Sequence, residues 1–260
     1  MAGDAGLIPT AAAVHEYLKK SGAYDQVKNW FLRRTAYPVV VVGASGAGKS
    51  ALIKSLFGEP SYISRLNRSD EVKEVIGKLE KTLFIKLIDT PGEQQHEAKR
   101  KSAFRRVMRY SSVGIINVVS YGYHEGKYTR DQVYSSKTNS PSEAFLDARR
   151  DVERTLVKEW TELLCGDEGP AKWVTTVATK ADLWWIAGAD QPVLNYYDSS
   201  PYLTALGVAS ERPHSVKSYA SVRQLFFDTT PMSGYYSDQQ RKEDHVSLIG
   251  HILEKASQHA

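Results

Sequence analysis

The feature that most restricts the fold of this chain is the octet GASGAGKS at residues 43–50. It follows the apolar run PVVVV at residues 38–42 and leads into ALIKSL at residues 51–56. A continuous β-branched run is typical of a central parallel strand that is buried on both faces. We expect a helix from the end of the octet to about Phe57. The octet therefore lies at the junction of a buried strand and a helix.

The octet fits the pattern G-x-x-x-x-G-K-[ST], whose glycines let successive backbone N–H groups turn inward around phosphate oxygens. The helix N-terminus adds its partial positive charge. We expect Lys49 to bridge the β- and γ-phosphates and Ser50 to ligate Mg²⁺. The nucleotide-binding residues of this segment are predicted to be Gly43, Ala44, Ser45, Gly46, Ala47, Gly48, Lys49, Ser50 and Ala51. A glycine-rich turn without a ligand is the competing interpretation, and the octet alone selects neither a base nor a reaction.

A second motif, LIDTPGE, occupies residues 87–93 and ends an apolar strand. A carboxylate at the end of such a strand is the expected partner of Mg²⁺, so Asp89 is a candidate to hold a metal-bound water. Gly92 has no side chain to keep its N–H from the γ-phosphate. Taken alone, D-T-P-G is also an ordinary β-turn.

A third motif, TKAD, occupies residues 179–182 directly after the apolar segment KWVTTVA. The order GxxxxGKS, DTPG and TKAD resembles the phosphate, metal-switch and guanine-recognition motifs of the translation-factor and Ras-like superclass of GTPases. The octet is also similar to those of septins and immunity-associated GTPases. The resemblance covers roughly residues 37–258 and leaves the N-terminal helices out.

The resemblance implies a guanine site around the third motif. Asp182 would accept hydrogen bonds from the guanine N1–H and exocyclic amine, and the stem of Lys180 would lie along the base. Adenine presents neither donor, and it would leave a desolvated carboxylate unpaired. The family pattern is Asn-Lys-x-Asp, so Thr179 is expected to weaken one cross-link to the phosphate loop. A last contact should follow the final strand, at Ala220-Ser221 or, as the competitor, at Thr229-Thr230.

Hydrolysis requires an oriented water and positive charge near the γ-phosphate. Ras-like enzymes place a glutamine after the glycine of the second motif, where this chain has Glu93 and then Gln94. Both are candidate catalytic residues, and Gln94 is favoured because a carboxylate would repel the γ-phosphate.

The first switch is expected within residues 58–70, where the family supplies a threonine to Mg²⁺. This segment has no threonine, so Ser69 is the candidate ligand, with Ser64 and Ser61 behind it. Arg68, alongside Arg65, is a candidate for catalytic charge supplied in cis, although arginines in an exposed loop are more often only solvated.

Strands that alternate with helices predict an α/β fold with a largely parallel sheet. With the resemblance, this becomes a three-layer P-loop NTPase fold, or G domain, with one antiparallel strand pair and an N-terminal helical extension. The antiparallel pair is expected at residues 72–79 and 83–88. We predict the extension at residues 1–35 and the G domain at residues 36–258, with insertions at about 121–142 and 183–213.

The composition is that of a soluble globular protein, and it argues against a dedicated nucleic-acid binder, a disulfide-linked protein and a membrane protein. Net charge is +4 with 25% charged residues, which falls short of a dedicated nucleic-acid binder. One cysteine allows no intrachain disulfide, and no apolar run is long enough for a membrane span. The N-terminus has no basic start before an apolar run, so we expect no secretory signal. We therefore expect a cytoplasmic protein. The basic stretch at residues 99–109 could contact acidic partners, anionic lipid or nucleic acid, but a solvated helix face is favoured.

These motifs predict a GTP-binding protein that hydrolyses GTP to GDP and phosphate with Mg²⁺. It would act as a molecular switch with slow turnover that a protein effector or activator stimulates. The alternative is a nucleotide-gated protein that forms a GTP-dependent homodimer or assembly with little hydrolysis. An ATPase or kinase with a similar phosphate loop is the third interpretation.

Overall fold

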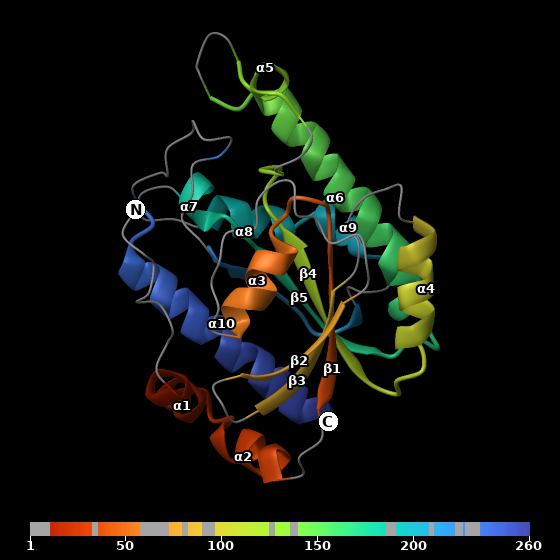
Figure 1. The fold of residues 1–260 in the computed structure, drawn as a ribbon, viewed down its shortest axis with the longest axis vertical. Helices are drawn as coiled ribbons and strands as arrows, with labels where there is room; N and C mark the ends of the chain where they lie inside the picture. The colour runs from red at the N-terminus through yellow and green to blue at the C-terminus, as the bar shows by residue number, and fades with distance from the viewer. Residues whose placement is uncertain are drawn as a thin grey trace.

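The computed structural model describes residues 11–32, 36–57, 73–79, 83–89, 97–124, 128–135, 140–185, 191–207, 211–221, 226 and 235–260. Within them one six-stranded sheet has the order β2-β3-β1-β4-β5-β6 (Figure 1). Every neighbouring pair is parallel except β2 and β3, which are antiparallel, as the sequence predicts. The strands are β1 (Tyr37–Gly43), β2 (Lys73–Leu79), β3 (Leu83–Asp89), β4 (Val113–Val119), β5 (Ala171–Ala178) and β6 (His214–Ser218).

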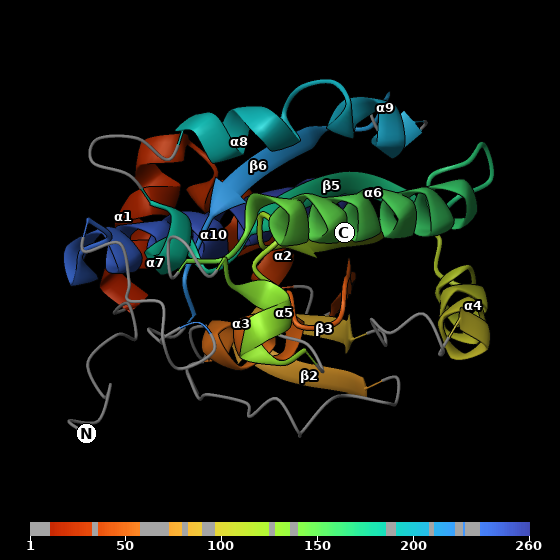
Figure 2. The same ribbon diagram turned by 90° about the horizontal axis from the view of Figure 1, so that it is seen from above.

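Helices cover both faces of the sheet, and the apolar run of β1 explains why. Val39 and Val41 pack into one core, whereas Val40 and Val42 pack into the other. The first core includes residues of α1 (Ala11–Ser21), α2 (Tyr24–Leu32), α3 (Lys49–Leu56) and α10 (Asp238–His259). The second includes residues of α4 (Glu97–Val107), α6 (Glu143–Leu164), α8 (Gln191–Tyr197) and α9 (Tyr202–Leu206). Figure 2 shows the sheet between α6 and the long α10, so the predicted three-layer α/β fold is confirmed.

The N-terminal segment forms two short helices, which are separated at Gly22. Gly22 has a φ of 77°, in the left-handed region that favours glycine, and α1 ends there. The buried side chains of Val14, Leu18 and Val27 join the core that contains α10, and Figure 1 shows both helices beside α10. The predicted N-terminal extension is therefore helical and packs against α10. A boundary between this extension and a G domain at residues 35 and 36 stays a prediction.

The two predicted insertions contain more regular structure than expected. The predicted insertion at 121–142 includes α5 (Arg130–Val133) and a bridge between Tyr134 and Pro141. Thr129 and Gln132 form a capping box for α5, a local signal that the sequence analysis overlooked. Residues 183–213 contain α8 and α9, and the second residue of α8 is Pro192. Proline is tolerated in the first turn of a helix, where its missing N–H has no intrahelical partner.

Within the described residues, no helix combines the length and the apolar character that crossing a bilayer requires.

Candidate functional site

The phosphate-loop octet joins β1 to α3 with three glycines at positive φ. The values are 141° for Gly43, 78° for Gly46 and 97° for Gly48. A Cβ on Gly43 would lie 2.2 Å from the carbonyl oxygen of Val118 in β4. Position 43 therefore requires glycine, both because of its positive φ and because the Val118 carbonyl leaves no room for a Cβ. This is the backbone shape that turns N–H groups toward an anion.

The ammonium group of Lys49 is held inside this loop. Its Nζ donates to the carbonyl oxygens of Gly43 and Ala44, at 3.0 Å each, and the residue is 8% exposed. A cation in this position, at the first residue of α3, faces the region that the loop encloses. The arrangement keeps a positive charge ready for an anionic ligand at low desolvation cost, because the charge is already removed from most of the solvent.

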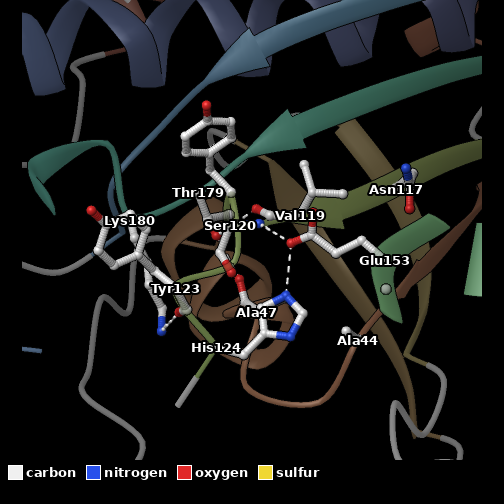
Figure 3. A network of polar contacts seen from close by, with 12 residues as sticks. Ala44, Ala47, Asn117, Val119, Ser120, Tyr123, His124, Glu153, Thr179 and Lys180 are labelled. Atoms are coloured by element: carbon white, nitrogen blue, oxygen red, sulfur yellow. Dashed lines mark hydrogen bonds and ion pairs between the residues drawn. The ribbon is translucent and has the colours of Figure 1, made fainter. Parts of the chain in front are cut away.

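Thr179 connects the phosphate loop to the third motif. Its hydroxyl oxygen lies 2.5 Å from the carbonyl oxygen of Ala47 and 2.9 Å from that of Val119, so one proton is shared between two acceptors (Figure 3). The residue is 2% exposed, and a Cβ on Gly48 would lie 3.4 Å from its hydroxyl. The hydroxyl thus makes a direct link to the loop, while the expectation that threonine weakens this cross-link relative to asparagine stays a prediction.

The rest of the TKAD segment is fixed just as firmly. Lys180 has a φ of 58°, and its Nζ donates to the carbonyl oxygen of Tyr123 at 2.7 Å. Asp182 is 2% exposed in the first turn of α7 (Ala181–Trp184). The indole N–H of Trp184 donates to the Thr179 carbonyl at 2.8 Å, and that ring is buried in the core. A buried carboxylate on a braced turn is suited to selecting a ligand by its hydrogen-bond donors.

Ala220-Ser221 lies directly beside this turn. The Tyr219 carbonyl accepts from the Ala181 backbone N–H at 3.3 Å, and the Tyr219 N–H donates to Ala178 at 3.0 Å. Both Ala220 and Ser221 are buried. The structure thus brings the favoured last contact next to the third motif, while the competing pair at residues 229–230 lies outside the described residues.

The two described candidates for the metal lie at the same edge of the sheet. In the parallel pairing of β1 and β3, Asp89 is opposite Val41, two positions before the phosphate loop. Ser50 is half-buried in the first turn of α3. A hydroxyl and a carboxylate on adjoining segments are oxygen donors of the type that Mg²⁺ prefers, so the residues present fit this ion.

Five predicted site residues belong to segments that the structure does not describe. They are the second-motif glycine, the two candidate water-orienting residues, the candidate arginine and the candidate first-switch ligand: Gly92, Glu93, Gln94, Arg68 and Ser69. Their roles stay predictions.

A buried carboxylate close to this site was missed by the sequence analysis. Glu153 is 2% exposed and lies on the buried stripe of α6, where Leu146, Val157, Trp160 and Leu164 supply apolar side chains. An acidic residue at an apolar position of an amphipathic helix is the signal that would have found it, because a buried charge needs specific partners.

The basic stretch is only partly a solvated face. Arg100 is buried, and its guanidinium forms an ion pair with Glu159 of α6 at 3.0 Å. Arg105, Arg106 and Arg109 are exposed. The stretch thus contributes one contact that fixes α4 to α6 and several surface charges.

Comparison with known proteins agrees with this architecture. Residues 38–149 match the family model described as "50S ribosome-binding GTPase". A septin homolog, spn2 of Schizosaccharomyces pombe, is 31% identical over 97 residues, which cover 33% of this chain and 29% of that protein. The matched segment thus spans less than a third of the curated relative.

Solved structures resemble the fold at low sequence identity. A dimerisation-deficient mutant of Toc33 from Arabidopsis thaliana superposes with a TM-score of 0.50 at 14% identity, covering 91% of this chain and 92% of that one. The Arl6 small GTPase from Trypanosoma brucei gives a TM-score of 0.47 at 13% identity, with 85% and 99% covered. The likeness to these structures concerns the fold alone.

Proposed function

We propose that the chain is a P-loop GTPase of the translation-factor and Ras-like superclass, which binds GTP with Mg²⁺ and hydrolyses it slowly, as a switch that a partner stimulates. The match of residues 38–149 to a GTPase family model supports this proposal. The observation that carries the proposal is the Thr179 hydroxyl, which ties the phosphate loop to the segment that holds Asp182. A nucleotide has its phosphates and its base at opposite ends. A direct bond between the two recognition segments keeps their separation fixed, as one ligand requires.

The proposed roles divide along the ligand. The backbone of residues 43–51 and Gly92 surrounds the phosphates, and Lys49 neutralises their charge. The base contacts the TKAD turn, where Asp182 accepts from guanine, and the adjoining Ala220 and Ser221. Mg²⁺, held by Ser50, Asp89 and Ser69, would supply charge neutralisation of the phosphates.

The proposed catalytic groups are Lys49 of the phosphate loop and three residues outside it. We assign the orientation of water to Gln94, with Glu93 beside it, and assign charge in cis to Arg68. The proposal includes the G domain at residues 36–258 behind the extension at residues 1–35, and a cytoplasmic location. A protein effector or activator is the proposed partner. Contact of residues 99–109 with nucleic acid or a membrane is less favoured.

Purified protein is expected to release phosphate from GTP in a single-turnover assay at a low rate, on the order of 10⁻³ per second or slower. The reason for the slow rate is that the glutamine position of Ras-like enzymes is occupied by Glu93. Replacing Gln94 with alanine should lower the rate further without changing GTP affinity. Phosphate release no faster than in the enzyme-free control, while GTP is demonstrably bound, would remove hydrolysis from the proposal and leave a binding switch.

A second candidate is a nucleotide-gated assembly protein. The septin homolog resembles part of this chain, and the Toc33 structure is named as a mutant deficient in dimerisation. Sedimentation with a non-hydrolysable GTP analogue and with GDP separates the two functions. A larger species with the analogue alone supports assembly, and a monomer in both states supports the switch.

A further inference from the structure

Glu153 is the centre of a buried polar network that joins α6 to the segment following β4. Its Oε1 accepts from the backbone N–H of Ser120 at 2.8 Å and lies 2.7 Å from Nε2 of His124 (Figure 3). Its Oε2 accepts from the hydroxyl of Tyr197 in α8 at 2.7 Å. That hydroxyl in turn accepts from the backbone N–H of Tyr121 at 2.8 Å. One carboxylate therefore fixes three points of residues 120–124, directly or through Tyr197.

The imidazole of His124 meets this carboxylate in a buried position. The residue is 3% exposed, and burial lowers its pKa below the ordinary value, although Glu153 acts in the opposite direction. The pair has only one arrangement in which the bond forms with a neutral ring, namely Nε2–H donating to the carboxylate. The ring position is thus specified by hydrogen bonding and by packing.

The segment held in this way, together with the residue before it, contacts the TKAD motif. The carbonyl of Tyr123, the residue before His124, accepts from Nζ of Lys180. The last residue of β4, Val119, supplies the carbonyl shared with the Thr179 hydroxyl. Figure 3 shows the carboxylate and imidazole on one side of this segment and the TKAD residues on the other. A displacement of residues 120–124 would therefore move the Lys180 ammonium.

We propose that Glu153 and His124 are positioning residues for base recognition, which hold the Tyr123 carbonyl where it orients Lys180 against the base. This inference rests on the proposed function of the TKAD segment as a guanine site. It assigns nucleotide specificity partly to α6 and to the insertion, two elements outside the recognised motifs. The phosphate loop should be unaffected, because its own contacts run through Lys49 and Thr179.

The test compares His124→Phe with His251→Phe. Both substitutions keep a ring and remove a buried imidazole, but His251 lies in the other layer, where Nε2 contacts Thr175 and Ser215. The dissociation constants of GDP and of pyrophosphate are measured for both variants and for the native chain. We expect His124→Phe to weaken GDP about tenfold, as loss of one buried polar contact implies, and to leave pyrophosphate within about twofold. His251→Phe should leave the dissociation constants of both GDP and pyrophosphate unchanged.

Two substitutions of Glu153 provide a second readout. Leucine leaves three buried donors without an acceptor, whereas glutamine keeps one oxygen for Ser120 and His124 and removes only the acceptor of the Tyr197 hydroxyl. Glu153→Gln should therefore retain more of the GDP affinity than Glu153→Leu, which should lose it or fail to fold. Equal GDP affinity in the native chain and His124→Phe would overturn the inference while the guanine site stands. No GDP binding by the native chain would overturn the proposed function itself.

Discussion

Replacing Lys49 with alanine is expected to lower GTP affinity by at least about a hundredfold. The ammonium is 8% exposed and is held by the Gly43 and Ala44 carbonyls, so its charge is available to phosphate without further burial. Each hydrogen bond to a charged group contributes about 1.5–3 kcal/mol, and two phosphate contacts correspond to roughly two to four powers of ten in affinity. Titration calorimetry with GTP and Mg²⁺ measures the change.

The matched control is Lys54→Ala, on the exposed side of the same helix. This variant should bind GTP within about twofold of the native chain, since an exposed lysine contributes little to a distant site. If Lys49→Ala retained native affinity while remaining folded, the octet would be a structural turn and the phosphate assignment would be wrong.

Replacing Asp182 with asparagine is expected to exchange guanine for xanthine as the preferred base. The carboxylate is 2% exposed and can only accept hydrogen bonds, which matches the N1–H and amine donors of guanine. An amide at this position presents a donor that fits the 2-oxo group of xanthine and opposes the guanine amine. Loss of a matched donor at a buried acceptor is expected to cost GTP about two to four powers of ten in affinity. Competition of GTP and XTP for a fluorescent nucleotide measures both changes.

The control substitution is Asp167→Asn, in the exposed turn between α6 and β5. It makes the same chemical change far from the TKAD segment and should leave the GTP-to-XTP ratio unaltered. A parallel loss of both nucleotides in Asp182→Asn, together with a large drop in melting temperature, would indicate a structural carboxylate and contradict its assignment to the base.

Local patterns were sufficient to predict most of the fold. The β-branched run of β1, the two-strand hairpin and the break at Gly22 each depend on residues close together in the chain. No helix was predicted at α5 or α8, although the capping box at Thr129 is a local signal for α5, and Pro192 is in the first turn of α8, where proline is tolerated. These two short helices do not change the order of the strands.

For the candidate site, the sequence predicts the motif residues but not the contacts that join them. Motif order placed Lys49 and Asp182 on segments that the structure brings together through Thr179. The Thr179 cross-link itself depends on a carbonyl in another loop, and the Glu153–His124 pair joins a helix to an insertion. Such contacts depend on how the layers pack, and spacing within one segment does not encode them. Sequence alone therefore predicts which groups are present more readily than which carbonyl each one meets.

The central claim is that this is a guanine-nucleotide site, and competition between GTP and ATP for one fluorescent GDP analogue tests it most directly. The native chain, with Mg²⁺ present, should release the analogue at a GTP concentration at least about a hundredfold below that required of ATP. The reason is that adenine offers the buried Asp182 carboxylate neither of the two hydrogen-bond donors that guanine presents. Displacement by ATP at an equal or lower concentration would contradict the account.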